Sequence, residues 1–255
     1  MAVKYVGIDL SQIEMRIATH VSEDPELVRI FWAGEDIHTS TACRMFGLPP
    51  DKIDGKKHRY PAKRTGFGVL YGISAAGLLN VFFHDGVTNF TERDCQRFID
   101  SWFDTYTGVK HWIDSTEAFI RRNGYVVDMF GRRRWIPEVY STLPYVVDAG
   151  LRQGVNTPIQ SGAQGYIKEV MKQSLPYRQA WKRIGVRCDL VMQVHDELIY
   201  EMDEEWIPYI VPIFKQVMET AVPLIVPVKA DVEIGTTWGN MKEVSEEELW
   251  KLRVI

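Results

Sequence analysis

The sequence predicts an α+β fold, in which strands from both ends of the chain form a sheet and a helical region is inserted between them. A β-rich run at residues 3–8 opens the chain and ends at Asp9. Two apolar runs far downstream, 186–194 and 198–202, flank a short polar turn and give the clearest strand signal. Because the intervening residues are mostly helical in pattern, the order of elements indicates an α+β fold with a helical insertion.

The elements follow from local signals. Ser11 and Glu14 form a Ser-x-x-Glu capping box, which predicts a helix directly after the first strand. Short helices are predicted at 23–48 and a loop at 48–57. A helix then runs from His58 to about Gly72, where Pro61 is tolerated in the first turn, and further helical segments reach Asn123.

The second half begins with a β-hairpin in GYVVDMFGRRRWIP, which turns at Phe130-Gly131. Residues 145–181 are predicted to be helical, with Pro158 expected to start or kink a helix. After the strand pair come a helix at about 204–220 and a strand near 228–234. The pattern contains no internal repeat and no flexible linker.

The composition is that of a globular protein. The 255 residues are 45% hydrophobic and 25% charged, which excludes a disordered tail, a collagen-like fibre and a coiled coil. Without a run of about 18 apolar residues or an apolar N-terminal stretch, the chain is predicted to be cytoplasmic and not to enter a membrane. Cys43, Cys95 and Cys188 form no Cys-x-x-Cys pair, so a reducing compartment is expected.

The formal charge of −4 hides an uneven distribution. Residues 1–192 carry a net charge of +4 and residues 193–255 a net charge of −8. The basic residues of the first region include two clusters. Clusters of this kind are most often solvated surfaces, but two of them in one region leave phosphate binding open. The clusters are Lys56, Lys57, Arg59, Lys63 and Arg64, and then Arg121, Arg122, Arg132, Arg133 and Arg134.

Two aspartates stand at strand ends. Asp9 closes the first strand, and Asp196 lies in the turn between the two later ones. If these strands are neighbours, both carboxylates meet at one edge of the sheet and suit a pair of Mg²⁺ ions about 4 Å apart, as in phosphoryl transfer. The alternative is that each aspartate is an ordinary turn residue.

Four side chains spaced by four form a stripe on the helix predicted from His58. At this spacing each residue advances by about 40° around the helix axis, so cationic and aromatic groups share one face. Guanidinium and ammonium groups suit phosphates and rings suit a base, although an amphipathic helix with one basic end explains the pattern as well. Gly68 and Gly72, which lower helix stability, suggest that another group packs closely against this helix beside the aromatic rings. The stripe is Arg59, Lys63, Phe67 and Tyr71.

These segments resemble the three motifs of the family A DNA polymerases, the group of bacterial DNA polymerase I and many phage replicative enzymes. DLSQIEMR from Asp9 resembles motif A, Arg59-x3-Lys63-x3-Phe67-Gly-x2-Tyr-Gly resembles motif B, and QVHDE from Gln193 resembles motif C. GEDIHTSTA, GYVVDMFGRRRWIP and NTPIQSGAQGYIK agree as well. The resemblance implies an antiparallel palm sheet that carries the catalytic aspartates, with a helical fingers insertion.

The resemblance also implies a division of the chain. The palm is expected at 1–22 and 143–240, and the fingers at 23–142 with the motif B helix at about 58–72. The remaining residues, 241–255, form a C-terminal tail.

Site residues are carried over from the same motifs. Asp9, Asp196 and the Leu10 carbonyl are implied to hold two Mg²⁺ ions, for which Mn²⁺ can substitute, and Lys63 joins the two aspartates as catalytic. The residues implied to bind the dNTP are Arg59, Lys63, Phe67, Tyr71, Glu14, His38 and Gln12. Those implied to touch template, primer or the new base pair are Arg134, Arg152, Asn156, Gln160, Gln193 and His195, with Glu197 a secondary acid beside the metals.

The implied function is template-directed DNA synthesis, with primer-template DNA and dNTPs as partners. Two alternatives stay open: a non-catalytic nucleic-acid-binding module that kept the fold, and a single-chain RNA polymerase. A binding module has no need for Asp9, Arg59, Lys63 and Asp196 together, and Glu14 after DLSQI favours DNA.

Three features depart from the family pattern. Family members carry a thumb and often a 3′–5′ exonuclease before motif A, whereas only eight residues precede Asp9, so we expect a second chain to supply both. Gly66 replaces a larger residue, and QSGAQG at 160–165 is closer to phage-type enzymes, which suggests a bacterial or phage-infected cell. The tail either docks a partner or packs on its own domain, through Leu249, Trp250, Leu252, Val254 and Ile255 after a second capping box, Ser245 with Glu248.

Overall fold

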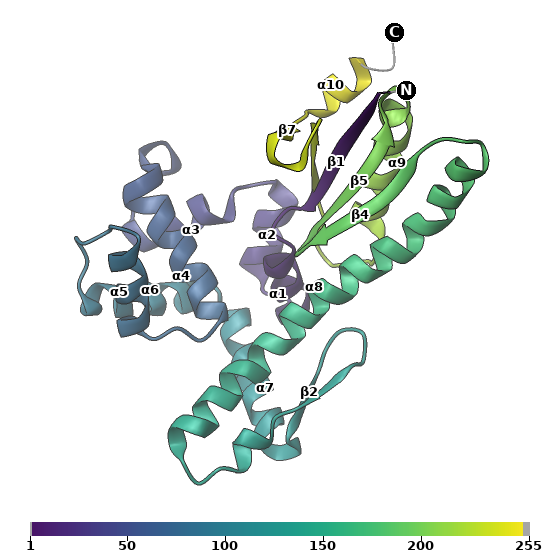
Figure 1. Cartoon of the computed structure of the whole chain (residues 1–255). Helices are drawn as coiled ribbons and strands as arrows, with labels where there is room; N and C mark the ends of the chain where they lie inside the picture. Colours follow the sequence, from purple (N-terminus) through teal and green to yellow (C-terminus); the bar gives the residue numbers. More distant parts are fainter. Residues whose placement is uncertain (1, 252–255) are drawn as a thin grey trace. The chain divides into compact units, whose positions relative to one another are not determined.

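The computed structural model describes residues 2–251, and the chain divides into two compact units (Figure 1). Unit 1 comprises residues 1–16 and 162–255, and unit 2 comprises residues 17–161. The divisions fall inside helices α1 (Ile13–Ser22) and α8 (Pro144–Arg183), so these two helices contribute to both units. The element order confirms the α+β class predicted from the sequence.

Unit 1 is built on a five-stranded antiparallel sheet with the order β4-β5-β1-β6-β7. The first strand of the chain therefore lies in the middle of the sheet, between strands that are more than 180 residues away in sequence (Figure 1). The strands are β1 (Val3–Leu10), β4 (Cys188–Val194), β5 (Glu197–Asp203), β6 (Ala230–Gly235) and β7 (Lys242–Glu243).

The core of unit 1 lies between the sheet and helix α9 (Ile207–Thr220), which packs on β1 and β6. Alternate residues of β1, namely Val6, Ile8 and Leu10, are fully buried. Because side chains alternate across a strand, Gly7 and Asp9 lie on the opposite face. The packing of β1 thus fixes the face to which Asp9 belongs.

Unit 2 is mainly helical. Its core is rich in aromatic side chains, with rings of Trp102 and Tyr106 at 4.8 Å and of Phe90 and Phe98 at 5.1 Å. Buried rings contribute large apolar areas and prefer such tilted contacts. The helices are α2 (Pro25–Ala33), α3 (Ile37–Phe46), α4 (Tyr60–Leu70), α5 (Ala75–His84), α6 (Glu92–Thr105) and α7 (Thr107–Asn123).

The predicted hairpin is present in unit 2 as β2 (Tyr125–Val127) and β3 (Arg133–Trp135). Its turn is held by the buried carboxylate of Asp128, which accepts hydrogen bonds from the N–H groups of Phe130 and Arg132. A small apolar cluster beneath it joins the hairpin to α7 and α8; its members are Ile120, Val126, Ile136 and Leu151.

Several boundaries differ from the sequence prediction. Helix α1 begins at Ile13, and the Gln12 carbonyl accepts the first helical hydrogen bond, so the Ser11-Glu14 capping box is wrong as the helix start. The residues before α4 form a π-helical turn, Gly55–Arg59, instead of continuing one helix from His58. Helix α8 continues through Pro158.

The C-terminal capping box is present. The Ser245 Oγ and the Glu248 carboxylate hydrogen-bond at 2.8 Å at the start of α10 (Glu246–Lys251), and Leu249 is buried. The tail residues 252–255, and with them Leu252, Val254 and Ile255, lie outside the described residues, as does the side chain of Trp250. Within the described part of the chain, no helix combines the length and apolar character needed to span a bilayer.

Candidate active site

Three carboxylates form a row across neighbouring strands of unit 1. Asp9 on β1 pairs in register with Glu197 on β5 and with Asp231 on β6. Directly opposed residues of antiparallel strands project from the same face, with Cβ atoms about 4.5–5.5 Å apart. Asp196 joins them from the β4–β5 turn, where its carbonyl accepts a hydrogen bond from the Leu10 N–H at 3.2 Å. The sheet register therefore brings Asp9 and Asp196 together.

The row carries unbalanced negative charge. Partial burial, followed by the charges of Asp196, Glu197 and Asp231, raises the pKa of Asp9 to about 6. Burial and the nearby Glu233 and Asp196 likewise raise the pKa of Glu197. Like charges at such distances disfavour ionisation of each other, so the arrangement is electrostatically unfavourable without a cation.

Gly7 leaves space for one of these groups. A Cβ at Gly7 would collide with the carboxylate of Glu197, which lies over this position on the sheet face. The absence of a side chain at Gly7 thus leaves room for the carboxylate of Glu197, the residue paired in register with Asp9.

The donor set fits Mg²⁺. No group of three or more His, Cys, Asp or Glu side chains within residues 2–251 has the arrangement of a complete metal site. Mg²⁺ usually takes only one or two protein carboxylates and completes its octahedron with water and substrate phosphates. Asp9 and Asp196 would supply such a pair of hard oxygen ligands, and a cation there would relieve the repulsion that raises the pKa of Asp9.

Strained turns flank the carboxylates. Gln12 follows the end of β1 with φ 55°, and His195 precedes Asp196 with φ 53°. Non-glycine residues with positive φ cost energy and tend to occur at functional sites. The side chain of Gln193 supports the second turn by donating from Nε2 to the His195 carbonyl at 2.9 Å.

A buried arginine fixes the first turn. Arg16 on α1 is 5% exposed and donates from Nε to the Ser11 carbonyl at 2.8 Å and from Nη1 to the Pro227 carbonyl. It thereby ties the segment after Asp9 to the loop before β6. Glu14 lies half-buried in the first turn of the same helix.

The predicted basic stripe lies in unit 2. Arg59 is the last residue of the π-helical turn, Lys63 and Phe67 belong to α4, and Tyr71 follows its end. Lys63 is exposed, Phe67 and Tyr71 are half-buried, and Arg59 forms a bidentate ion pair with Asp36. Cations and rings therefore share this helix, although Arg59 belongs to a different helical geometry.

His38 packs against one residue of the stripe. It is 4% exposed, and its ring centroid is 5.6 Å from that of Phe67. Burial, with the charges of Arg59 and Lys63, lowers the pKa of His38 to about 4 despite the opposing effect of Asp36. The imidazole is therefore neutral near pH 7.

The two glycines beside the stripe have a structural reason. A Cβ at Gly68 would lie 2.7 Å from Cγ2 of Ile73. Gly72 has φ +67°, and a Cβ there would lie 2.7 Å from Cγ of Arg152. The close approach suggested by these glycines is made by Ile73 and Arg152 themselves.

The residues implied to contact DNA lie mostly on α8. Arg152, Asn156 and Gln160 are spaced by four, so they share a helix face. Arg134 on β3 reaches the same helix and donates to Gln153 and Thr157 at 3.0 Å each. Unit 2 therefore gathers these four residues around α8, whereas Gln193 and His195 belong to unit 1.

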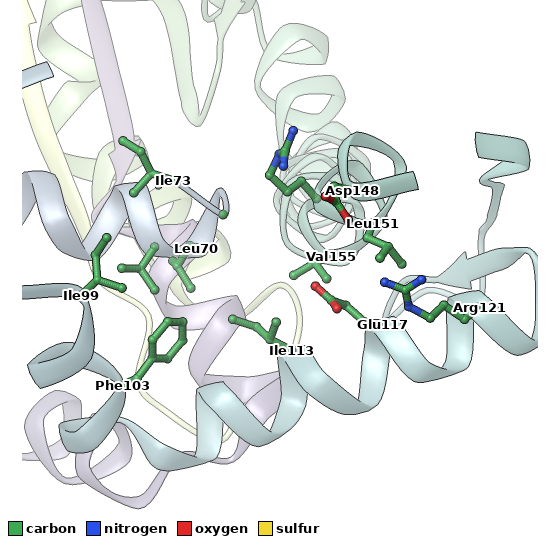
Figure 2. A pocket seen from close by; sticks show the side chains of 13 residues that line it. Leu70, Ile73, Ile99, Phe103, Ile113, Glu117, Arg121, Asp148, Leu151 and Val155 are labelled. Carbon is green, nitrogen blue, oxygen red and sulfur yellow. The ribbon is translucent and has the colours of Figure 1, made fainter. Parts of the chain in front are cut away.

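A pocket of about 300 Å³ opens beside the end of α4 in unit 2 (Figure 2). One half is apolar, with Leu70, Ile99 and Phe103 facing the hollow, and the other half carries charged groups that include Glu117 and Arg121. Burial raises the pKa of Glu117. The complete apolar lining is Val69, Leu70, Ile73, Ile99, Phe103, Ile113, Leu151 and Val155.

Two acidic residues were missed by the sequence interpretation. Asp231 joins the carboxylate row, and its signal was the alternation in Ala230–Gly235, where acids at 231 and 233 share one face. Asp36 pairs with Arg59 from 23 residues away, and only the N-cap preference of aspartate before α3 was visible locally.

Comparison with known proteins shows which family model the chain matches. Residues 1–240 match the family model for DNA polymerase family A. The chain is 38% identical over 238 residues to the thermostable DNA polymerase I of Thermus aquaticus and 36% identical over 235 residues to the DNA polymerase I of Streptococcus pneumoniae. These matches cover 93% and 92% of this chain but only 27% and 26% of those proteins.

A solved structure is also similar. The POL domain of Pol1 from M. smegmatis, in complex with DNA primer-template and dNTP, matches with a TM-score of 0.82 and 33% sequence identity. The match covers 92% of this chain and 40% of that one. The chain thus spans about a quarter of the length of the relatives named above and less than half of the solved chain.

Proposed function

Since the chain belongs to the family A DNA polymerases, we propose that it carries the catalytic part of a template-directed DNA polymerase. In the proposed reaction the 3′-hydroxyl of a primer attacks the α-phosphate of a dNTP and pyrophosphate leaves. The observation that carries this proposal is the convergence of Asp9 and Asp196 at one end of the sheet, in a chain that also holds the basic stripe of α4.

Asp9 and Asp196, with the Leu10 carbonyl, would hold two Mg²⁺ ions, and Mn²⁺ would substitute for them. When bound, these ions supply stabilisation of the attacking and leaving oxygens. Glu197 lies beside the pair and adds negative charge that favours cations. Register on three strands holds these side chains, so their positions are set before a substrate arrives.

The residues of α4 would bind the nucleotide. Arg59 and Lys63 neutralise triphosphate oxygens, with Lys63 acting on the leaving pyrophosphate, and Phe67 stacks on the base. The neutral His38 would contribute a hydrogen bond to the phosphates from behind Phe67. Tyr71 would guard the position of the template base.

Other residues would select and align the substrates. Glu14, with Gln12 beside it, would exclude a ribose 2′-hydroxyl and thereby favour dNTPs over rNTPs. The proposed contacts to template, primer and new base pair are Arg134, Arg152, Asn156, Gln160, Gln193 and His195.

The functional division follows the proposed roles. Residues 1–22 and 143–240 would form the palm and 23–142 the fingers. Residues 241–255 would be a docking segment for a second protein chain. Pull-down with the tagged chain, with and without residues 241–255, tests this part: loss of a co-purifying polymerase subunit on truncation supports it, and unchanged recovery contradicts the docking segment.

Primer extension by the full chain tests the function itself. With a single templated dNTP and Mg²⁺, we expect extension by one nucleotide that depends on the template base and fails with the matching rNTP. DNA binding without extension favours the non-catalytic module, and equal use of rNTP favours an RNA polymerase. With phenylalanine at 67, we also expect discrimination against dideoxynucleotides, measured as a lower rate of chain termination.

A further inference from the structure

Asp36 and Arg59 form a close ion pair within unit 2. Arg59 donates from Nε to Oδ2 of Asp36 at 2.6 Å and from Nη2 to Oδ1 at 3.1 Å. Two parallel bonds between a guanidinium and a carboxylate are both stronger and more directional than a single contact. Since Asp36 precedes α3 and Arg59 precedes α4, the pair fixes the arginine against the start of another helix.

The carboxylate of Asp36 is itself held in place. As the N-cap of α3, it accepts hydrogen bonds from the backbone N–H of Thr39 at 3.1 Å and from the Thr39 hydroxyl at 2.6 Å. Burial raises the pKa of Asp36, but the hydrogen bonds from Arg59 and Thr39 outweigh it and lower the pKa to about 2. The group is therefore an anion with a fixed orientation at neutral pH.

The geometry leaves part of the guanidinium unused. An arginine has five N–H donors, and the bonds to Asp36 use the Nε hydrogen and one hydrogen of Nη2. Within residues 2–251, the Arg59 side chain makes no further hydrogen bond. Its side chain is still 41% exposed, so the Nη1 end remains open to solvent or a ligand.

We infer that Asp36 is a positioning residue for nucleotide binding: it grips one edge of the Arg59 guanidinium and presents the other edge to triphosphate oxygens. The inference rests on the proposed function, in which Arg59 binds the triphosphate. An arginine that is already held loses less rotamer freedom when a ligand binds, so the ion pair favours binding although it adds a negative charge nearby.

The test compares four variants of the full chain in single-nucleotide primer extension. Asp36→Asn keeps a good N-cap for α3 but removes the charged, bidentate partner of Arg59. We expect it to raise the KM for dNTP about three- to tenfold with kcat nearly unchanged. In an Arg59→Ala background the same substitution should have no further effect on KM, because its target is gone.

Asp85→Asn is the matched control. Asp85 pairs with Arg64, which also belongs to α4, at 2.9 Å and with similar exposure, yet neither residue is in the proposed nucleotide site. We expect its KM to equal that of the wild type. Circular dichroism melting of each variant reports any loss of fold.

The possible failures are distinguishable. No extension by the wild-type chain contradicts the proposed function. Normal extension in which Arg59→Ala raises KM but Asp36→Asn does not overturns the role of Asp36 alone. A KM increase of the same size in the Arg59→Ala background also overturns it, since Asp36 would then act through α3.

Discussion

The carboxylate end of the sheet and the start of α4 differ in how their negative charges are balanced. At the sheet, strand register places Asp9 between Glu197 and Asp231, and burial with the neighbouring anions raises its pKa to about 6. At α4, Asp36 has a cationic partner in Arg59 and a pKa of about 2. The carboxylate of Asp9 therefore lies among like charges, whereas the carboxylate of Asp36 is neutralised by Arg59.

The two regions therefore respond differently to a ligand. Backbone pairing that holds like charges together lowers the stability of the fold, and a bound cation offsets this repulsion. A paired arginine is stable before its ligand arrives and gains by being oriented. Substitutions at the sheet should therefore affect activity more than stability, whereas those near α4 should affect both moderately.

Substitution of Asp196 at the end of the sheet should have the strongest effect on activity. Asp196→Ala should lower nucleotide incorporation by about a hundredfold or more, while the melting temperature stays equal or rises because repulsion with Asp9 is relieved. Primer extension and thermal melting measure the two effects. Asp189→Ala, an exposed aspartate on β4, is the control and should keep full activity. Retained incorporation by Asp196→Ala would contradict the assignment.

Substitution of Arg16 tests whether the turn after Asp9 depends on the hydrogen bonds from this buried arginine. Arg16→Met keeps the apolar stem but leaves the Ser11 and Pro227 carbonyls without their charged donor, which should lower the free energy of unfolding by about 2–3 kcal/mol. Urea denaturation measures the loss. Arg187→Met, which removes an exposed ion pair with Glu201, should cost under about 1 kcal/mol. Equal losses in the two variants would argue against a supporting role for Arg16.

A comparison of Gly72→Ala with Gly47→Ala distinguishes the effect of backbone strain from that of a steric contact. Gly72→Ala and Gly47→Ala both place a Cβ at nearly the same positive φ, +67° and +66°, and each should cost about 1–2 kcal/mol. Only the first would also push against Arg152, since nothing lies within 4 Å at Gly47. We therefore expect Gly72→Ala alone to weaken binding of primer-template DNA, measured by fluorescence anisotropy. Equal DNA affinities in the two variants would show that the contact does not matter.

The smallest effect is the pH dependence of the paired region. Asp36 has a pKa lowered from 3.8 to about 2 in the folded protein, so its stabilisation is present above pH 3.8 and disappears as the pH falls through 2. The difference in unfolding free energy between wild type and Asp36→Asn should be constant from pH 7 to about 4 and shrink below that. Chemical denaturation across this range checks it, and a constant difference down to pH 2 would exclude the ion pair as its source.

Local patterns were enough to predict much of the fold. Alternation and apolar runs predicted β1, β4 and β5, and the Phe130-Gly131 turn predicted the hairpin. Boundaries failed where tertiary contacts decide them. Arg16 bonds the carbonyls of Ser11 and Pro227 and holds the turn before α1, which begins at Ile13. Helix α8 continues through Pro158, which no local pattern predicted.

The site was predictable only in part because its partners are distant in sequence. Asp9 and Asp196 were visible as acids at strand ends, but Asp231 belongs to the row only through the β1–β6 register. Asp36 meets Arg59 across two helices, and no local pattern encodes that contact. Gly72 indicated a close approach, but the sequence could not show that the approaching group is the stem of Arg152.

We propose that the Asp9–Asp196 end of the sheet binds divalent cations. Titration of Mn²⁺ into the wild-type chain, followed by electron paramagnetic resonance of the free ion, measures this directly. We expect Mn²⁺ binding to weaken at least about tenfold in Asp9→Asn, while Asp189→Asn matches the wild type. Equal Mn²⁺ affinity in wild type and Asp9→Asn would contradict it.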